Sequence, residues 1–267
     1  MKWQMRMPEE TNNLSYFTID SHLGTHLDAP LHFVENGKAV GVIAKGQEIR
    51  GDIVVNNMDM VNAYKTILKK QKQPKKLLEQ PKSSSALIFY WGIKKVFPEL
   101  DLHNILFSDD YRTEFEHIFK KGSIYQDPTV YINITSVYKE EDAPDGCMNW
   151  FTMINVPNNQ GQNWDQLIAE ARKNIIAKVN RILKTDLEPL IEVEEVLEPR
   201  TIESKTSSAQ GALYGNSSNN RFAAFLRHAN YSSEIKNLYF CGGSVHPGGG
   251  IPLSLLSAKI MTEFVEK

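Results

Sequence analysis

The sequence predicts a mixed α/β (α+β) fold, and three patterns in the 267-residue chain lead to this expectation. Short apolar runs bounded by turn residues have the length and the β-branched and aromatic content of strands. Residues 164–183 repeat apolar side chains every three or four positions, which is the period of a helix with one buried face. The end of the chain combines a strand, a glycine-rich turn and a second helix. A hydrophobic content of 41% is sufficient for a sizeable core.

The first third of the chain is expected to be mainly extended. Strands are predicted, in order, at residues 16–22, 39–44 and 49–57. The last of these contains the continuous apolar run Ile53-Val54-Val55, which predicts a strand buried inside an α/β sheet. A helical spacing follows from residue 58 to residue 78, where Pro74 and Pro81 interrupt it.

The middle of the chain is predicted to form a sheet and two helices. Extended segments are expected at 84–92, 122–138, 149–157 and 187–197, with Ile124, Val130, Ile132 and Ile134 pointing inward in the second. A helix at 109–119 is indicated by two aspartates near its start, where carboxylates complement the helix dipole. The helix at 164–183 is expected to bury one face, formed by Leu167, Ile168, Ala171, Ile175, Ile176, Val179 and Ile182. The polar stretch 203–220 is either a linker or an ordered functional loop.

The pattern at the C-terminus is typical of a ligand site: a strand at 237–241, a glycine-rich turn and a helix from residue 251. Gly242 and Gly243 permit a sharp turn and leave no Cβ to obstruct a flat ligand. The triplet 248–250 leads into a helix start whose free N–H groups favour an electron-accepting group such as an isoalloxazine ring. The spacing is equally compatible with a turn that serves only close packing. Arg221 and Arg227, nearby in sequence, are candidates for phosphate binding or for helix capping.

The same segment, NLYFCGGSVHPGGGIPLSLLSAK at 237–259, resembles the C-terminal flavin signature of phytoene and related carotenoid desaturases, which belong to the flavin-containing amine oxidase-like proteins. GALYGNSSNNRFAAFLRH at 211–228 and the stretches 103–115 and 143–157 resemble that family too. The similarity runs from about Val34 to Lys267 and is greatest to the hydroxycarotenoid 3,4-desaturase branch. It implies FAD as cofactor, a polyene as substrate, and a partial FAD/NAD(P)-binding flavoprotein fold with a mixed-sheet substrate domain.

The resemblance also implies that different parts of the chain belong to different domains. Residues 36–82 are expected to supply strands and a helix of the nucleotide-binding domain, 83–200 the substrate domain, and 201–267 the C-terminal flavin-binding segment. The residues implied as flavin contacts are Gly242, Gly243, His246, Pro247, Gly248, Gly249, Gly250, Ile251 and Pro252. His246 is expected either beside the ring or as a hydrogen-bonded turn residue. No catalytic side chain is implied, because orientation beside the flavin matters as much in this chemistry as an acid or base.

One family feature has no counterpart in the sequence, the opening strand and G-x-G-x-x-G turn that hold the ADP pyrophosphate. None of the early glycines, at positions 24, 37, 41, 46 and 51, has that spacing. The chain therefore resembles the C-terminal portion of a desaturase without its dinucleotide cradle, so FAD binding depends on the glycine turn. We expect the strands at 53–57 and 238–241 to have unpaired edges and uncovered apolar faces.

A second motif lies at residues 20–33, DSHLGTHLDAPLHF, and resembles the HxGTHxDAPxHF signature of metal-dependent cyclases and hydrolases of the kynurenine formamidase (arylformamidase) type. The resemblance, over about residues 5–33, implies metal ligands at His22, His26 and Asp28 and an acid/base role for His32. Imidazole and carboxylate groups suit Zn²⁺ or Mn²⁺, whose bound water would be the nucleophile. Residues 1–35 would then be hydrolase-like, and the two resemblances meet at 34–40, as in a chimera.

Composition narrows the possible partners and cellular location of the protein. A formal net charge of −2 argues against a nucleic-acid partner, and no apolar run approaches the length of a membrane span. The two distant cysteines predict a reducing, cytoplasmic location, with peripheral membrane contact because the implied polyene must leave a bilayer. Nothing predicts the oligomeric state. The leading interpretation is an FAD-dependent polyene desaturase. The alternatives are a metal-dependent hydrolase and an inactive fragment that binds lipid or aggregates.

Overall fold

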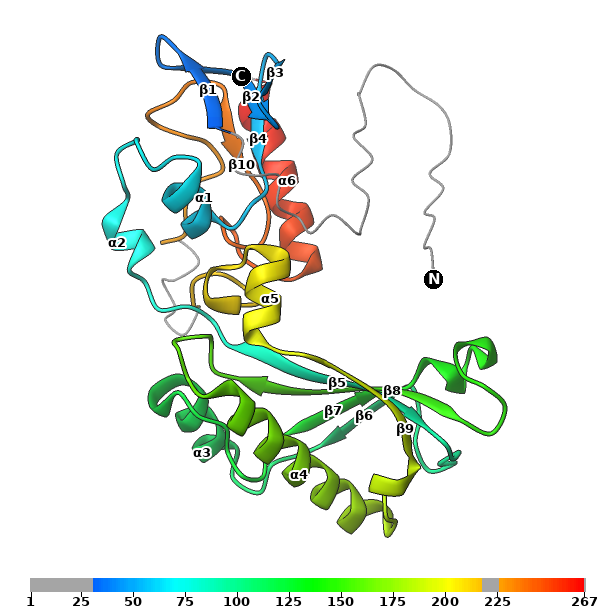
Figure 1. The fold of residues 1–267 in the computed structure, drawn as a ribbon. Coiled ribbons are helices and arrows are strands. Elements are labelled where there is room, and N and C mark those ends of the chain that lie inside the picture. Colours follow the sequence, from blue (N-terminus) through cyan, green and yellow to red (C-terminus); the bar gives the residue numbers. More distant parts are fainter. Residues whose placement is uncertain (1–30, 218–225, 267) are drawn as a thin grey trace.

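The computed structural model describes residues 31–217 and 226–266, with side chains from residue 34 onward. The predicted strand at 16–22, the motif residues His22, His26 and Asp28, and Arg221 lie outside these ranges. Figure 1 shows two lobes, here called the sheet lobe and the turn lobe, with a short helix, α5 (Pro199–Thr206), between them. No helix within the described ranges has the length and apolarity needed to cross a bilayer.

The sheet lobe is built on a five-stranded sheet in the order β6-β7-β8-β5-β9, in which every neighbouring pair is antiparallel. The strands are β5 (Ser85–Ile93), β6 (His103–Leu106), β7 (Val130–Asn133), β8 (Met148–Val156) and β9 (Ile191–Leu197). The expectation of a mixed sheet is therefore wrong. β6, β7 and β8 follow one another as adjacent antiparallel strands, and β9 returns antiparallel to β5 after the long helix α4 (Trp164–Leu183).

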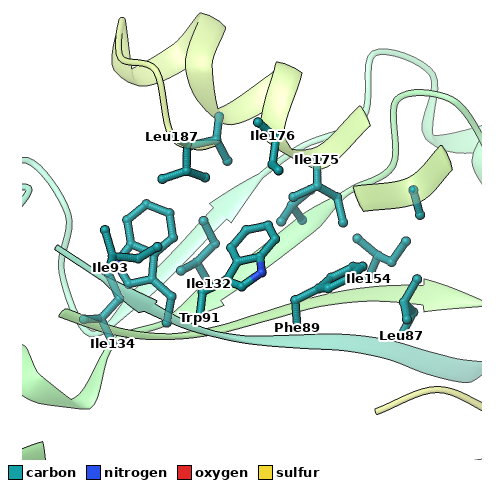
Figure 2. Close-up of a cluster of buried hydrophobic side chains, with 14 of the residues drawn as sticks. Leu87, Phe89, Trp91, Ile93, Ile132, Ile134, Ile154, Ile175, Ile176 and Leu187 are labelled. Atoms are coloured by element: carbon teal, nitrogen blue, oxygen red, sulfur yellow. The ribbon is translucent and has the colours of Figure 1, made fainter. Parts of the chain in front are cut away.

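The core of this lobe lies between α4 and one face of the sheet, as Figure 2 shows. Every second residue of β8 from Met148 is buried, which is the alternation of a strand with one covered face. The side chains packed there include Leu87, Phe89, Trp91, Ile132, Trp150, Ile154, Ile175 and Val179. The predicted bounds of α4 are confirmed, although Ile182, expected to be inward, is 42% exposed because it lies in the last turn of the helix.

The turn lobe joins two segments that lie far apart in sequence. β1 (Leu31–Glu35), β2 (Lys38–Ala44) and β3 (Gln47–Arg50) form one antiparallel sheet, and β4 (Val54–Asn56) pairs in parallel with β10 (Leu238–Phe240). Three helices pack around them: α1 (Met60–Thr66), α2 (Lys75–Leu78) and α6 (Ile251–Val265). Its core contains Met60, Tyr64, Leu238, Phe240 and Val245.

Several predicted elements of this lobe are divided or displaced. The strand expected at 49–57 splits into β3 and β4, which belong to different sheets, and the helix expected at 58–78 splits into α1 and α2, the second beginning after Pro74. The run expected to be buried is only partly so: Val54 is 6% exposed, but Ile53 is 43% and Val55 41% exposed. The β4–β10 pair has no further named strand on either side within the described chain, but the expectation of an unpaired edge is wrong for β10, because Phe240 N–H donates to the Asn230 carbonyl (2.9 Å) and the Leu238 carbonyl accepts from Ser232 N–H (2.8 Å).

Two further differences concern polar segments. The stretch expected as a linker or loop from residue 203 is described as far as residue 217 and begins inside α5. Glu198 caps the N-terminus of this helix by accepting from the backbone N–H groups of Arg200 and Thr201. Of the extended segment at 122–138 only β7 is a strand, yet Val130, Ile132 and Ile134 are fully buried as predicted. The helix expected at 109–119 is α3 (Tyr111–Glu116) followed by a π-helical turn at His117–Lys121.

Candidate functional site

The glycine-rich turn connects β10 directly to α6, so the predicted strand–turn–helix is confirmed. Its glycines differ in what surrounds them. A Cβ on Gly249 would lie 2.6 Å from Tyr214 Cδ1 and 2.9 Å from Tyr214 Cα, and one on Gly242 would overlap the Asn57 side-chain oxygen. A Cβ on Gly250 would meet no atom of the described residues within 4 Å. Close packing therefore explains Gly242 and Gly249, whereas Gly250 borders open space.

Buried side chains fix the path of the turn. Arg227, only 7% exposed, donates to the carbonyl oxygens of Tyr214 (3.0 Å), Gly243 (3.0 Å) and Asn216 (2.7 Å). The Arg227 guanidinium thus connects three backbone carbonyl groups. This differs from the two predicted roles of Arg227, phosphate binding and helix capping. Asn230, also buried, donates to the His246 carbonyl (2.9 Å) and to Ser257 of α6 (Oγ, 2.9 Å).

His246 lies in this turn as a hydrogen-bonded residue. Its backbone N–H donates to the His228 carbonyl at 2.9 Å, and its own carbonyl accepts from Asn230. This agrees with the turn-residue interpretation of His246. A role for its side chain beside a flavin ring stays a prediction.

The start of α6 is open and apolar. Gly250 is the N-cap, with φ of +98°, and no described side chain accepts from the first N–H groups of the helix. Ile251 is 80% and Leu255 68% exposed, and Ser257 and Met261 are the only residues of α6 that are buried. Uncapped N–H groups carry the positive end of the helix dipole, so this end can stabilise a group that gains negative charge.

These residues fit one end of FAD and not the other. The open space at Gly250 and the uncapped helix start suit the isoalloxazine ring, and Asn56 at the end of β4 has a buried side-chain amide nitrogen without a hydrogen-bond acceptor among the described residues. The second strand–helix junction, from β4 to α1, does not suit a pyrophosphate. There Asp59 already accepts from the N–H groups of Val61 and Asn62, and its carboxylate would repel phosphate.

The side chains of His228, Tyr64 and Phe240 pack together beside the turn. His228 Nδ1 donates to the Ala229 carbonyl (2.6 Å), its Nε2 accepts from the Tyr64 hydroxyl (2.9 Å), and its ring packs edge-on against Phe240, with 4.4 Å between centroids. Burial lowers the pKa of His228 below its ordinary value of 6.5, because the charged imidazolium is the form that loses hydration. The neutral tautomer satisfies both ring nitrogens.

This burial predicts a pH dependence of stability. Because the folded pKa is depressed, the unfolded chain binds more protons as the pH falls through 6.5, so stability present at pH 7.5 is lost toward pH 5.5. We expect the thermal midpoint to fall by about 2–4 °C over this range. A His228→Gln variant, which does not titrate, should show a smaller decrease when both are followed by circular dichroism. Equal slopes for the two proteins would assign the pH dependence to other groups.

The second predicted site cannot be assembled from the described residues. His22, His26 and Asp28 lie outside them, and only the backbone of His32, in β1, is described. Between residues 34 and 217 and between 226 and 266, no three His, Cys, Asp or Glu side chains gather as a metal site requires. His103, in the sheet lobe, shares a 2.8 Å hydrogen bond with the Tyr131 hydroxyl.

Comparison with known proteins supports both sequence resemblances. Residues 2–104 match the family model described as putative cyclase, so that similarity extends well beyond the expected residues 5–33. A 1-hydroxycarotenoid 3,4-desaturase of Flavobacterium sp. (strain P99-3) is 59% identical over 230 residues, which cover 86% of this chain and 47% of the relative. Together these two matches span more residues than the chain contains, so they overlap and do not meet at a single boundary.

More distant relatives carry related names. A phytoene desaturase of Fusarium fujikuroi is 34% identical over 253 residues, 86% of this chain and 44% of the relative. A 4,4'-diapolycopene oxygenase of Methylomonas sp is 32% identical over 246 residues, 89% of this chain and 49% of the relative. A solved oxidoreductase structure from Methanosarcina mazei overlays with a TM-score of 0.49 at 15% identity, covering 90% of this chain and 48% of that one.

The chain thus spans about half the length of the curated relatives it matches. Three of these relatives, at 59%, 34% and 32% identity, match 86–89% of the chain and are named for reactions on carotenoids. Most of the chain is therefore similar to proteins named as carotenoid desaturases.

Proposed function

We propose that this chain carries the flavin-ring and polyene-binding portion of an FAD-dependent carotenoid desaturase. The observation that carries the proposal is the turn between β10 and α6, where Gly250 borders open space beside an uncapped helix start, in a chain 59% identical to a hydroxycarotenoid desaturase. Residues 242, 243 and 246–252 are the proposed flavin contacts. The turn lobe forms the flavin side and the sheet lobe, within residues 83–200, the substrate side.

The chain's own residues have three tasks in this reaction. When bound, FAD supplies the acceptor for a hydride from an allylic C–H, while a proton leaves the neighbouring carbon for water and a C=C bond forms. The helix start at residues 250–252 stabilises the negative charge that arises. The partly covered face of the five-stranded sheet orients the polyene, and the apolar residues there pack along it.

The proposed substrate is a polyene with a hydroxylated end, as the name of the 59%-identical relative indicates for that protein. Such a molecule resides in a bilayer, so transient membrane contact is part of the proposal. The exposed apolar residues of the α6 start, Ile251 and Leu255, are suited to it.

A single side chain at Gly250 tests the flavin site. Gly250→Val places two methyl groups in the open space where the ring is proposed, so we expect FAD affinity to fall at least about tenfold, equivalent to 1.4 kcal/mol. Gly161→Val is a matched control, because Gly161 also has a positive φ (+89°) and open surroundings, but lies in the sheet lobe before α4. Flavin fluorescence titration measures both. An equal loss of FAD affinity in the two variants would contradict the placement of the isoalloxazine ring at the turn.

A metal-dependent hydrolase is the second candidate function, because residues 2–104 match the putative cyclase family. In that case His22, His26 and Asp28 would bind Zn²⁺ or Mn²⁺ and His32 would transfer the proton. We expect a His22→Ala variant to have the same metal content and stability as the wild type if the desaturase proposal holds. Loss of one bound metal ion per chain on that substitution would favour the hydrolase.

A further inference from the structure

The face of the five-stranded sheet opposite α4 is only partly covered. At the end of the sheet nearest the turn lobe, Ile202 of α5 packs on Ala86 and Ile88. At the other end lies a cavity of about 570 Å³, here called the end cavity. Its lining includes Tyr90, Gly92, Thr135, Asp142, Asn149 and Phe151. It belongs to none of the elements that form the proposed flavin site.

An aromatic row runs across the sheet into this cavity. Tyr90 of β5 meets Phe151 of β8 edge-on, with 5.6 Å between ring centroids, and Phe151 meets Tyr131 of β7 in the same way at 6.2 Å. Tyr90 is 39% exposed and the row is open to solvent on one side. Next to it, Gly92 is paired with Asn149 and contributes no side chain. The result is a flat apolar strip that leads to a recess, which suits a long unsaturated chain.

The wall of the end cavity is polar and held in place by its own hydrogen bonds. Asp142 accepts from the Thr135 hydroxyl (2.5 Å) and from Lys139 Nζ (2.7 Å). Asn149 donates to the Thr135 oxygen (2.7 Å) and accepts from the Ser136 N–H (2.9 Å). These bonds attach the segment between β7 and β8 to the strand beneath it, so the wall has a defined position.

This wall offers acceptors to a ligand. A carboxylate has about four lone-pair sites, and Asp142 uses two of them within the wall. The hydrogen bonds from Lys139 and Thr135 hold the pKa of Asp142 below its ordinary value, so it is ionised and accepts only. Glu192, which pairs with Lys94 at 2.8 Å, and Glu195 line the same cavity, so its carboxylates outnumber the lysines that pair with them. A neutral group that donates a hydrogen bond fits this wall, and a carboxylate would be repelled by it.

We propose that the end cavity binds the hydroxyl-bearing end of an apolar polyene, with the chain along the Tyr90–Phe151 row and the hydroxyl donating to Asp142. This inference rests on the proposed function, since it assigns the end of the same substrate. It makes Asp142 a residue that determines specificity for a hydroxylated end over a hydrocarbon end.

Retinol, a fluorescent polyene alcohol, tests the assignment in the full-length chain without FAD. Its binding is measured by energy transfer from tryptophan, because Trp91 and Trp150 border the cavity. A hydrogen bond to a charged acceptor predicts that retinol binds at least about tenfold more tightly than retinyl methyl ether, which has no donor. Retinoic acid should bind more weakly than either.

Variants of two aspartates in one segment separate specificity from folding. Asp142→Asn should reduce the retinol-to-ether ratio to about one third or less, while Asp145→Asn, which alters an exposed residue outside the cavity lining, should leave it unchanged. An unchanged ratio in folded Asp142→Asn would overturn the role of Asp142.

Cysteine alkylation of the wild-type chain gives a second readout. Retinol should protect Cys147, which lines the cavity, from iodoacetamide, and should not protect Cys241, which lies at the end of β10. Protection of neither thiol, with binding measured, would place retinol elsewhere.

The retinol test of the end cavity can succeed or fail independently of the FAD-binding test. Retinol selectivity with Cys147 protection in a chain that fails to bind FAD would uphold the end cavity and contradict the proposed cofactor. FAD binding that Gly250→Val abolishes, together with no preference for retinol over its ether, would contradict the end cavity alone.

Discussion

Alanine at Gly249 is expected to destabilise the turn lobe by about 2–4 kcal/mol. The added Cβ would lie 2.9 Å from both Cα and Cβ of Tyr214, closer than such atoms approach in proteins. Tyr214 cannot move aside easily, because its N–H donates to Ser83 Oγ (3.0 Å) and its carbonyl accepts from Arg227 (3.0 Å). The strain must therefore be relieved by opening the turn between β10 and α6.

Hydrogen exchange measured by mass spectrometry reports this effect locally. Peptides that cover β10 and α6 should lose protection in Gly249→Ala, while peptides of β5 and β8 should keep it. Gly250→Ala is the matched control at the next residue: its Cβ meets none of the described residues, so only the backbone conformation (φ +98°, ψ 149°) contributes, about 1–3 kcal/mol. A Gly249→Ala protein as stable as Gly250→Ala would show that the turn is not closely packed against Tyr214.

Truncation of Phe89 to alanine should have an effect of similar or greater size on the sheet lobe, about 3–5 kcal/mol. Phe89 is fully buried in the centre of the sheet, where its ring stacks on Trp91 with 5.3 Å between centroids. Removal of the ring leaves a cavity below α4 that strands on both sides prevent from closing, since β5 is paired with β8 and β9. Urea unfolding followed by tryptophan fluorescence measures the loss.

The adjacent residue provides the comparison. Tyr90 points to the opposite face of the same strand and is 39% exposed, so Tyr90→Ala should cost about 1 kcal/mol. Similar losses for the two variants would mean that both faces of β5 are equally buried, contrary to the exposed fractions of Phe89 (0%) and Tyr90 (39%).

Elements with a complete local signal could be predicted from the sequence. The helices α4 and α6 begin at the expected residues, because a periodic apolar face needs only neighbouring residues to be recognised. The strands β5 and β8 agree to within one residue for the same reason. β6 was missed: it consists of four residues, none of them buried, and it is a strand only because β7 lies beside it.

The division of the predicted strand at 49–57 depends on partners that are distant in sequence. β3 pairs with β2 across a short turn, whereas β4 pairs with β10 more than 180 residues later. No local pattern distinguishes these two pairings. The exposure of Ile53 and Val55 follows from the same cause, since apolar residues predict burial only if a further layer covers them.

The candidate site could likewise be predicted from the sequence only in part. The position of the glycine turn was predictable from its spacing and is confirmed. Which glycine packs against protein and which faces open space depends on Tyr214 and Asn57, which come from other elements. The role of Arg227 in holding three carbonyls, and the end cavity around Asp142, also arise from contacts between separate segments and had no signal in the sequence.

The most direct test of the account is the visible spectrum of the purified chain after incubation with FAD and removal of free cofactor, combined with its metal content by mass spectrometry. We expect retained flavin absorbance that Gly250→Val removes and Gly161→Val does not, with no metal ion at one per chain. A colourless protein that contains one equivalent of zinc or manganese would contradict it and would assign the function to the histidine motif.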